Sequence, residues 1–220
     1  SNAGTMEKML QVDALDGATV NNENTGIIRG EFRGSAQGEG SKMTLTNQGT
    51  VEDALDGFSL GEDATMTIIN ENGGTAGKLL ANALVGGKTE AKNDGDVIGD
   101  MSGWSKGDGS TLTLTNTENG ASGMMSVESY LKGQATATNN GLAEGGMGGT
   151  YLRTVGEGGR AIGKAMALAF FPAVRHEMIV PIPVQAEVLP NGAGHPIHAP
   201  HTIPLSHFRA MGPGLIAIHE

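Results

Sequence analysis

Three histidines, His195, His198 and His201, follow one another at intervals of three residues in a proline-rich stretch. An extended polyproline-like backbone has three residues per turn, so this spacing aligns the three imidazoles on one side. Imidazole nitrogens bind divalent metals, either within one chain or as a ring with one histidine from each subunit of an oligomer. The stretch is therefore a candidate divalent-metal site; the simpler alternative is ordinary surface or interface histidines.

Aspartates recur through the first 150 residues and raise the question of carboxylate chemistry. Paired carboxylates cleave glycosidic bonds when one acts as acid and the other as base or nucleophile. These aspartates recur with turn residues and have no accompanying cluster of histidine or arginine. They also lack the glycine-rich nonapeptide spacing of calcium-binding repeats. We expect solvated turn residues and no catalytic residue at Asp53, Asp56, Asp63, Asp96, Asp100 and Asp108.

Two aromatic residues, Phe58 and Trp104, are candidate binding residues. They lie twelve residues before Asn70 and Asn116, and Trp104 is the only tryptophan of the chain. If they point outward, they form an aromatic platform for a sugar or a partner protein. If they point inward, they belong to the core, and the sequence leaves both orientations open.

These candidates lie on or beside a strict repeat. A short segment with a period of two, typical of a strand, precedes each of the last five asparagines of the repeat. A repeat of 23 residues that continues without insertion or deletion indicates a stacked repeat architecture. The asparagines fall 23 residues apart at Asn24, Asn47, Asn70, Asn93, Asn116 and Asn139.

The alternating segments predict one buried and one solvent-facing side. Threonines dominate the outer side, and the inner side is mostly apolar, as at Met43 and Leu45. A second inward column lies fifteen residues before each asparagine, and we assign the recurring glycines to turns. The coils that begin at Glu71 and Thr117 form a second repeat subtype. The second column comprises Phe32, Leu55, Met101 and Met124, with Lys78 as an exception, and the glycines include Gly34, Gly57, Gly103, Gly38, Gly61 and Gly107.

A 23-residue unit cannot bury its own apolar face, but stacked copies bury a continuous core. We therefore predict an all-β parallel β-solenoid, with a right-handed β-helix favoured, of about six coils over residues 4–150. The abundant glycines disfavour helical repeats of similar length. The asparagine column is predicted to form a structural ladder in which each side-chain amide bonds its neighbour.

The repeat resembles a known family in three strings, which begin at Met43 (MTLTNQGTV), Met66 (MTIINENG) and Leu112 (LTLTNTENG). They are similar to the coils of bacterial autotransporter and filamentous-haemagglutinin-like passenger domains, and the resemblance covers residues 15–150. It implies a secreted right-handed parallel β-helix, often an adhesin. Phage tail fibres and spikes are similar in architecture.

The chain divides into three parts. Residues 1–3 have the sequence expected of an expression-tag remnant. All eight prolines and all six histidines lie beyond residue 150. Within residues 151–220, helical spacing predicts a helix from Gly159 that Pro172 ends. An extended hairpin, with strands near residues 178–189 and 195–208, completes a small α+β element that caps the solenoid or forms oligomers.

Composition limits the partners. The formal charge of −10 disfavours nucleic acid, and no apolar run reaches the length of a membrane span. We expect a non-enzymatic extracellular or cell-surface module, structural or adhesive, that binds a host or cell-surface protein or glycan. Apart from the candidate metal, no cofactor is expected. The alternatives are a phage or pyocin tail-fibre segment on the virion surface, able to form homotrimers through its C-terminal region, and a glycan-cleaving β-helix enzyme.

Overall fold

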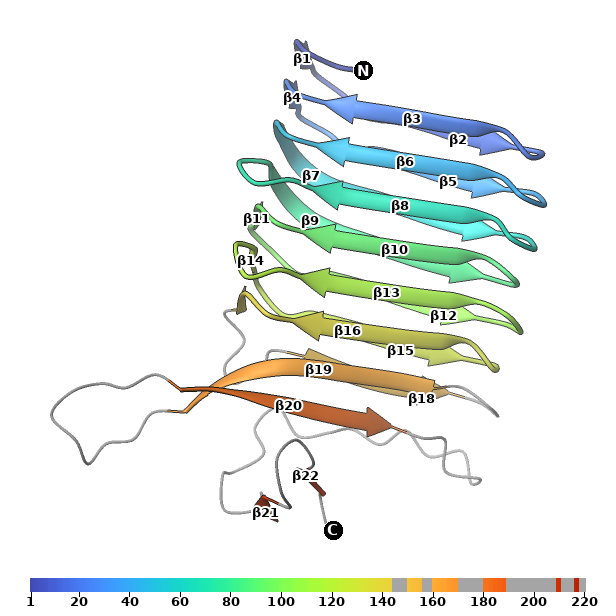
Figure 1. Cartoon of the computed structure of the whole chain (residues 1–220). Helices are drawn as coiled ribbons and strands as arrows, with labels where there is room; N and C mark the ends of the chain where they lie inside the picture. Colours follow the sequence, from blue (N-terminus) through green and yellow to red (C-terminus); the bar gives the residue numbers. More distant parts are fainter. Residues whose placement is uncertain (144–149, 156–159, 170–179, 189–208, 211–215, 218–220) are drawn as a thin grey trace, which may run out of the picture.

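The computed structural model describes residues 1–143, 150–155, 160–169, 180–188, 209–210 and 216–217. The chain winds through about six coils that stack into a parallel β-solenoid (Figure 1), as the repeat predicts. Each coil contributes one strand to an 8-stranded sheet and the rest to a 12-stranded sheet. Among the described residues, no helix is long and apolar enough to cross a membrane.

The 8-stranded sheet, here called the ladder sheet, contains the threonine-rich segments. Its first six strands pair in parallel, and every residue faces the residue 23 positions further along the chain, as Met43 faces Met66. The strands are β3 (Thr19–Asn24), β6 (Lys42–Asn47), β8 (Thr65–Asn70), β10 (Lys88–Asn93), β13 (Thr111–Asn116), β16 (Gln134–Asn139), β19 (Arg160–Ala169) and β20 (Val180–Val188).

The 12-stranded sheet has a long side and a short side. Its long outer strands are β2 (Leu10–Leu15), β5 (Phe32–Gln37), β7 (Thr50–Leu60), β9 (Thr75–Leu84), β12 (Met101–Lys106), β15 (Met125–Tyr130) and β18 (Thr150–Val155). Its short strands are β1 (Thr5–Met6), β4 (Ile27–Ile28), β11 (Asp96–Val97), β14 (Ala121–Ser122) and β17 (Leu142–Ala143). In β7 and β9 the short side runs into the long side. A separate pair joins β21 (Arg209–Ala210) to β22 (Ile216–Ala217).

The asparagine column forms the predicted ladder at the end of the ladder-sheet strands. Each Nδ2 donates to the Oδ1 of the next asparagine at 2.8 Å, and the last step, from Asn116 to Asn139, is 3.0 Å. Asn2 adds a rung before Asn24, also at 2.8 Å. Because the asparagines from 24 to 116 are fully buried, these bonds satisfy amides that water does not reach.

The core lies between the two sheets, and glycines make room for its largest side chains. Gly57 lies in the middle of β7, where an added Cβ would be 2.4 Å from Met66 Cε. An added Cβ at Gly103 would be 2.8 Å from Leu112 Cδ2. Such glycines were expected in turns, and that expectation is wrong for Gly34, Gly57 and Gly103, which are strand residues. Gly38, Gly61 and Gly107 do lie in turns with positive φ.

Coils of two subtypes keep the common length of 23 residues. Four residues separate Asn70 from β9, whereas two separate Asn47 from β7. The longer turn is offset by a corner after Leu84 that is one residue shorter and by the extra residue that β7 carries relative to β9. These changes shift the second inward column by one residue. Leu79 therefore lies inside where Lys78 was the exception to the expected column, and Met125 lies inside in place of the expected Met124.

Beyond the sixth coil, the predicted helix is wrong. Arg160–Ala169 is strand β19, which pairs in parallel with β16 and places Ala161 beside Ala135. The sequence from Ala161 alternates small and larger residues with a period of two, and β16 offers an open edge that a strand completes. The proline-containing strand β20 then pairs antiparallel with β19 and forms the sheet edge, where missing N–H donors are tolerated.

Candidate functional site on the outer face of the solenoid

Phe58 and Trp104 both point away from the core. Leu55 and Met101 begin the inward alternation on β7 and β12, and residues two and four positions later are buried as well. Because side chains alternate along a strand, the residue three positions later faces outward. The parity of each strand could therefore have given this orientation from the sequence, since Leu55 and Met101 were already assigned to the core.

The two aromatic residues belong to a larger apolar area. In register, Phe58 pairs with Asn82 of β9, which in turn pairs with Trp104. The two rings therefore flank one asparagine, two strand spacings or about 10 Å apart. We call the outward surface formed by Phe58, Leu60, Leu80, Leu84, Trp104 and Tyr130 the aromatic face. Each of these six side chains is half-buried except Leu60, which is 37% exposed.

Side-chain contacts fix the C-terminal half of the aromatic face. The rings of Trp104 and Tyr130 meet edge to face, with centroids 6.4 Å apart and an interplanar angle of 88°. The Tyr130 hydroxyl donates to the Glu128 carboxylate. Asn82 Oδ1 accepts the backbone N–H of Trp104 at 3.3 Å. Edge-to-face contact and these bonds hold the two rings in one arrangement before any ligand arrives.

An ion pair bounds the face at its N-terminal end. Arg33 Nε donates to Asp56 Oδ2 at 2.8 Å, and Arg33 also approaches Glu31 at 3.1 Å. The hydrogen bond with Asp56 raises the pKa of Arg33 above its ordinary value, and the nearby negative charges add to it. At the other end lie Lys106 and Glu128. The aromatic face thus has large apolar residues around the central Asn82 and charged residues at its rim, and a polar rim is typical of protein interfaces.

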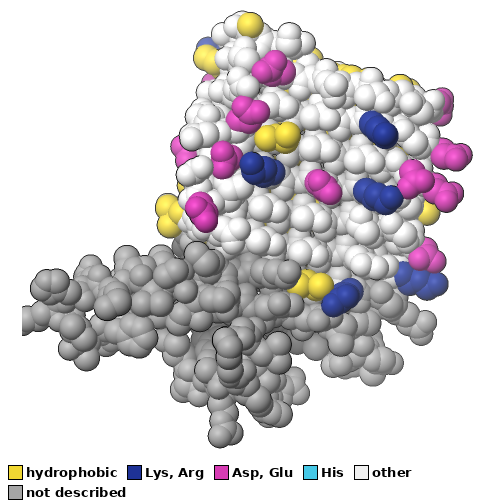
Figure 2. All heavy atoms as spheres, in the orientation of Figure 1, with side chains coloured by type: hydrophobic (Ala, Val, Ile, Leu, Met, Phe, Trp, Pro, Cys, Tyr) yellow, Lys and Arg dark blue, Asp and Glu magenta, His cyan; other side chains and the backbone are white. Residues whose placement is uncertain are grey.

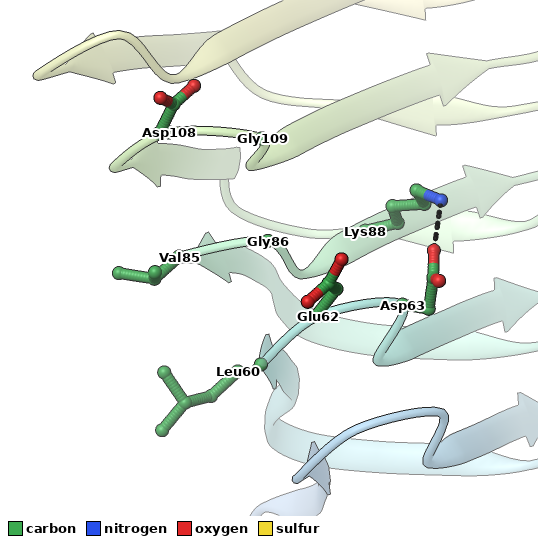
Figure 3. A pocket seen from close by; sticks show the side chains of 9 residues that line it. Leu60, Glu62, Asp63, Val85, Gly86, Lys88, Asp108 and Gly109 are labelled. Atoms are coloured by element: carbon green, nitrogen blue, oxygen red, sulfur yellow. Dashed lines mark hydrogen bonds and ion pairs between the residues drawn. The ribbon is translucent and has the colours of Figure 1, made fainter.

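A groove of about 580 Å³ adjoins the face at the corner that leads to the ladder sheet. Figure 3 shows Leu60 and Val85 on one side of it and the Lys88–Asp63 ion pair, 2.8 Å long, on the other. The short corner after Leu84 lies between two longer corners, and this difference in length hollows the surface. The hydrogen bond from Lys88, with its charge, lowers the pKa of Asp63.

The aspartates considered for catalysis are distributed over strands and turns: Asp53, Asp56 and Asp96 lie in strands, and Asp63, Asp100 and Asp108 lie outside them. The expectation of a solvated turn residue is wrong for Asp56, which is buried in β7. Asp56 binds Arg33, Asp63 binds Lys88, and Asp100 Oδ1 accepts the backbone N–H of Met124 at 2.8 Å. Asp108 lies 3.7 Å from Lys132. Within the described part of the chain, no three histidine, cysteine or acidic residues are grouped to hold a metal ion. The histidines proposed as a metal site, His195, His198 and His201, lie outside the described residues.

The opposite surface of the rod differs from the aromatic face. Figure 2 shows the outer side of the ladder sheet as a broad surface that is neither apolar nor charged for the most part, with a few apolar and basic groups and with acidic groups toward both lateral edges. Thr44 and Thr67 are neighbours in register on this side, as are Thr113 and Thr136, and Glu90 lies between the two pairs. The outer sides of the two sheets therefore differ: threonines predominate on the ladder sheet, whereas six large apolar residues share the aromatic face. Other exposed apolar side chains, such as Ile98 and Leu131, lie outside both surfaces.

No family model, curated protein or solved structure matches this chain.

Proposed function

We propose that the protein is a non-enzymatic structural or adhesive β-solenoid module of a bacterial surface protein, which binds a cell-surface partner through the aromatic face. The observation that carries this proposal is the outward position of Phe58 and Trp104 in one column of a flat sheet. Half-buried aromatic rings with a polar rim are typical of binding surfaces, in which such residues carry much of the binding energy.

The scaffold also supports this function. The asparagine ladder and the continuous core place every coil in a fixed register, so the face is built on rigid strands. Four of the aspartates, Asp56, Asp63, Asp100 and Asp108, contact neighbouring side chains or backbone groups that give them a structural role. A glycan-cleaving function has no comparable arrangement of residues among the described coils.

The test is binding of the labelled protein to cells and to a glycan panel. A Phe58→Ser/Trp104→Ser variant is expected to lose most binding and to stay folded at the assay temperature, since both side chains lie outside the core, with a melting temperature lowered by the lost ring contacts. The matched control, Thr113→Ser/Thr136→Ser, changes the opposite face and is expected to bind like the unmodified protein. Equal binding by both variants would refute the aromatic face as the binding surface.

A further inference from the structure

We propose that the partner of the aromatic face is a second copy of this chain, in an antiparallel two-fold dimer. This inference rests on the proposed function, because it identifies what the same face binds. The geometric basis is the central position of β9, which has β7 and β5 on one side and β12 and β15 on the other. A two-fold axis that lies between two facing copies and parallel to β9 therefore places β7 of one copy over β12 of the other, and β5 over β15.

This axis brings apolar residues together at the centre. It places Phe58 against Trp104 of the second copy, and Leu80 and Leu84 each against the same residue of the second copy. Asn82 meets its own counterpart, and two side-chain amides can pair with each other because each has a donor and an acceptor. An isologous interface requires this kind of self-complementarity, in which one patch fits itself.

The rim is compatible with the same axis. Glu128 is placed opposite Ser35 of the second copy, one column from Arg33, so the guanidinium that binds Asp56 in its own chain brings positive charge near this carboxylate. Leu60 meets the aliphatic stem of Lys106, which can cover apolar surface while its ammonium group stays in water. A two-fold axis along the rod would instead place Glu128 on Glu128, and like charges in contact are unfavourable. The charges therefore favour the axis along the strands and antiparallel rods.

The size of the face sets the expected strength. Five strands about 4.8 Å apart and six residues long cover about 500 Å². Stable complexes bury about 800 Å² on each partner, so this dimer should be weak and concentration-dependent. Facing sheets pack about 10 Å apart, which is too far for a direct disulfide but within reach of a short bis-maleimide.

The chain has no cysteine, so single thiols can be introduced without background. Asn82→Cys lies on the axis and is expected to cross-link to itself, whereas Thr113→Cys, on the outer side of the ladder sheet, is not. Leu60→Cys and Lys106→Cys are expected to cross-link when mixed and to remain single chains when treated separately. Both positions are exposed, so neither change affects the core.

Light scattering over a concentration series gives the independent measurement. The mass is expected to rise toward two chains, and Phe58→Lys is expected to hold it at one chain. A mass of one chain throughout, with no cross-linking at Asn82→Cys, would overturn the second-copy inference and leave the cell-binding test of the proposed function unaffected. Cross-linking of Thr113→Cys as strong as that of Asn82→Cys would also overturn it.

Discussion

Asn47 Nδ2 donates a 2.8 Å hydrogen bond to Asn70 Oδ1 in the next coil, and both side chains are fully buried. The same Nδ2 also donates to the Gly49 carbonyl at 3.2 Å and to the Thr75 carbonyl at 3.0 Å. One amide thus links its own turn to the following coil and to the following asparagine. The ladder is a principal link between successive coils.

Replacement of a ladder residue should destabilise the fold strongly. Asn70→Ala removes the acceptor for Asn47 and the donor for Asn93, and it leaves buried polar groups unpaired. Each unsatisfied group costs about 1–3 kcal/mol, so we expect a loss of about 3 kcal/mol. The exposed Asn72, two residues later, is the control, and Asn72→Ala should change stability by less than about 0.5 kcal/mol. Denaturant unfolding measures both; similar losses would contradict a structural ladder.

The glycine that follows each ladder asparagine should tolerate no side chain. At Gly49 an added Cβ would be 2.1 Å from the Gly26 carbonyl oxygen, and a strand-linked backbone cannot move aside. We expect Gly49→Ala to cost about 3 kcal/mol, at the upper end of overpacking effects. Gly4→Ala is the matched change, because an added Cβ there has no neighbour within 4 Å. If thermal melting shows equal stability for both variants, the close stacking of these turns is wrong.

One corner should gain stability on mutation. Leu131 has a φ of 44°, a left-handed conformation that costs a leucine about 1–2 kcal/mol, and its side chain is 55% exposed. Asparagine adopts this conformation more readily, so Leu131→Asn should stabilise the protein by about 1 kcal/mol. Val85, at the corresponding place in an earlier short corner, does not have positive φ, and Val85→Asn should give no gain. A gain at Val85 equal to that at Leu131 would argue against relief of backbone strain.

Acid should weaken one contact between turns. Thr117 Oγ1 donates to Asp94 Oδ1, and this bond is the main reason that the pKa of Asp94 lies below its ordinary value of 3.8. The unfolded state then binds more protons than the folded state in this range. The contribution is therefore fully present above pH 3.8 and is lost as the pH falls through the folded-state pKa.

Unfolding measurements from neutral to acidic pH test this expectation. Asp94→Asn should be less stable than the unmodified protein above pH 3.8, and the difference should shrink at lower pH. Thr117→Val removes the same bond and should give the same profile. A stability difference that does not change with pH would show that the ionised carboxylate makes no such contribution.

The sequence predicted the ladder sheet well because its strands keep one period. Residues 23 apart pair throughout β3 to β16, and the asparagines take the expected places. The other sheet was predicted less well. Its register depends on compensating changes in the lengths of turns and corners. Because of these changes, Leu79 and Met125 lie inside, although the strict 23-residue period points to the residues before them, Lys78 and Met124.

Two local features needed the structure. The segment from Arg160 was assigned to a helix because apolar residues recur at helical spacing, but the open edge of β16 imposes a strand. The candidate site was found only in part. Phe58 and Trp104 were identified as a pair, whereas Leu80, Leu84 and Tyr130 occupy the same surface only because of the shifted registers. Asn82 came between the two aromatic residues for the same reason.

The compensation between long turns and short corners has a consequence for how such a rod changes in length. Deletion of the 23 residues from one ladder asparagine to the next removes one complete coil. The strands of the two flanking coils then pair in the same register, whichever subtype of coil is deleted. A gene that encodes these coils can thus gain or lose blocks of 23 codons without a new core. Each coil that is added or removed would change the length of the rod by one strand spacing, about 4.8 Å.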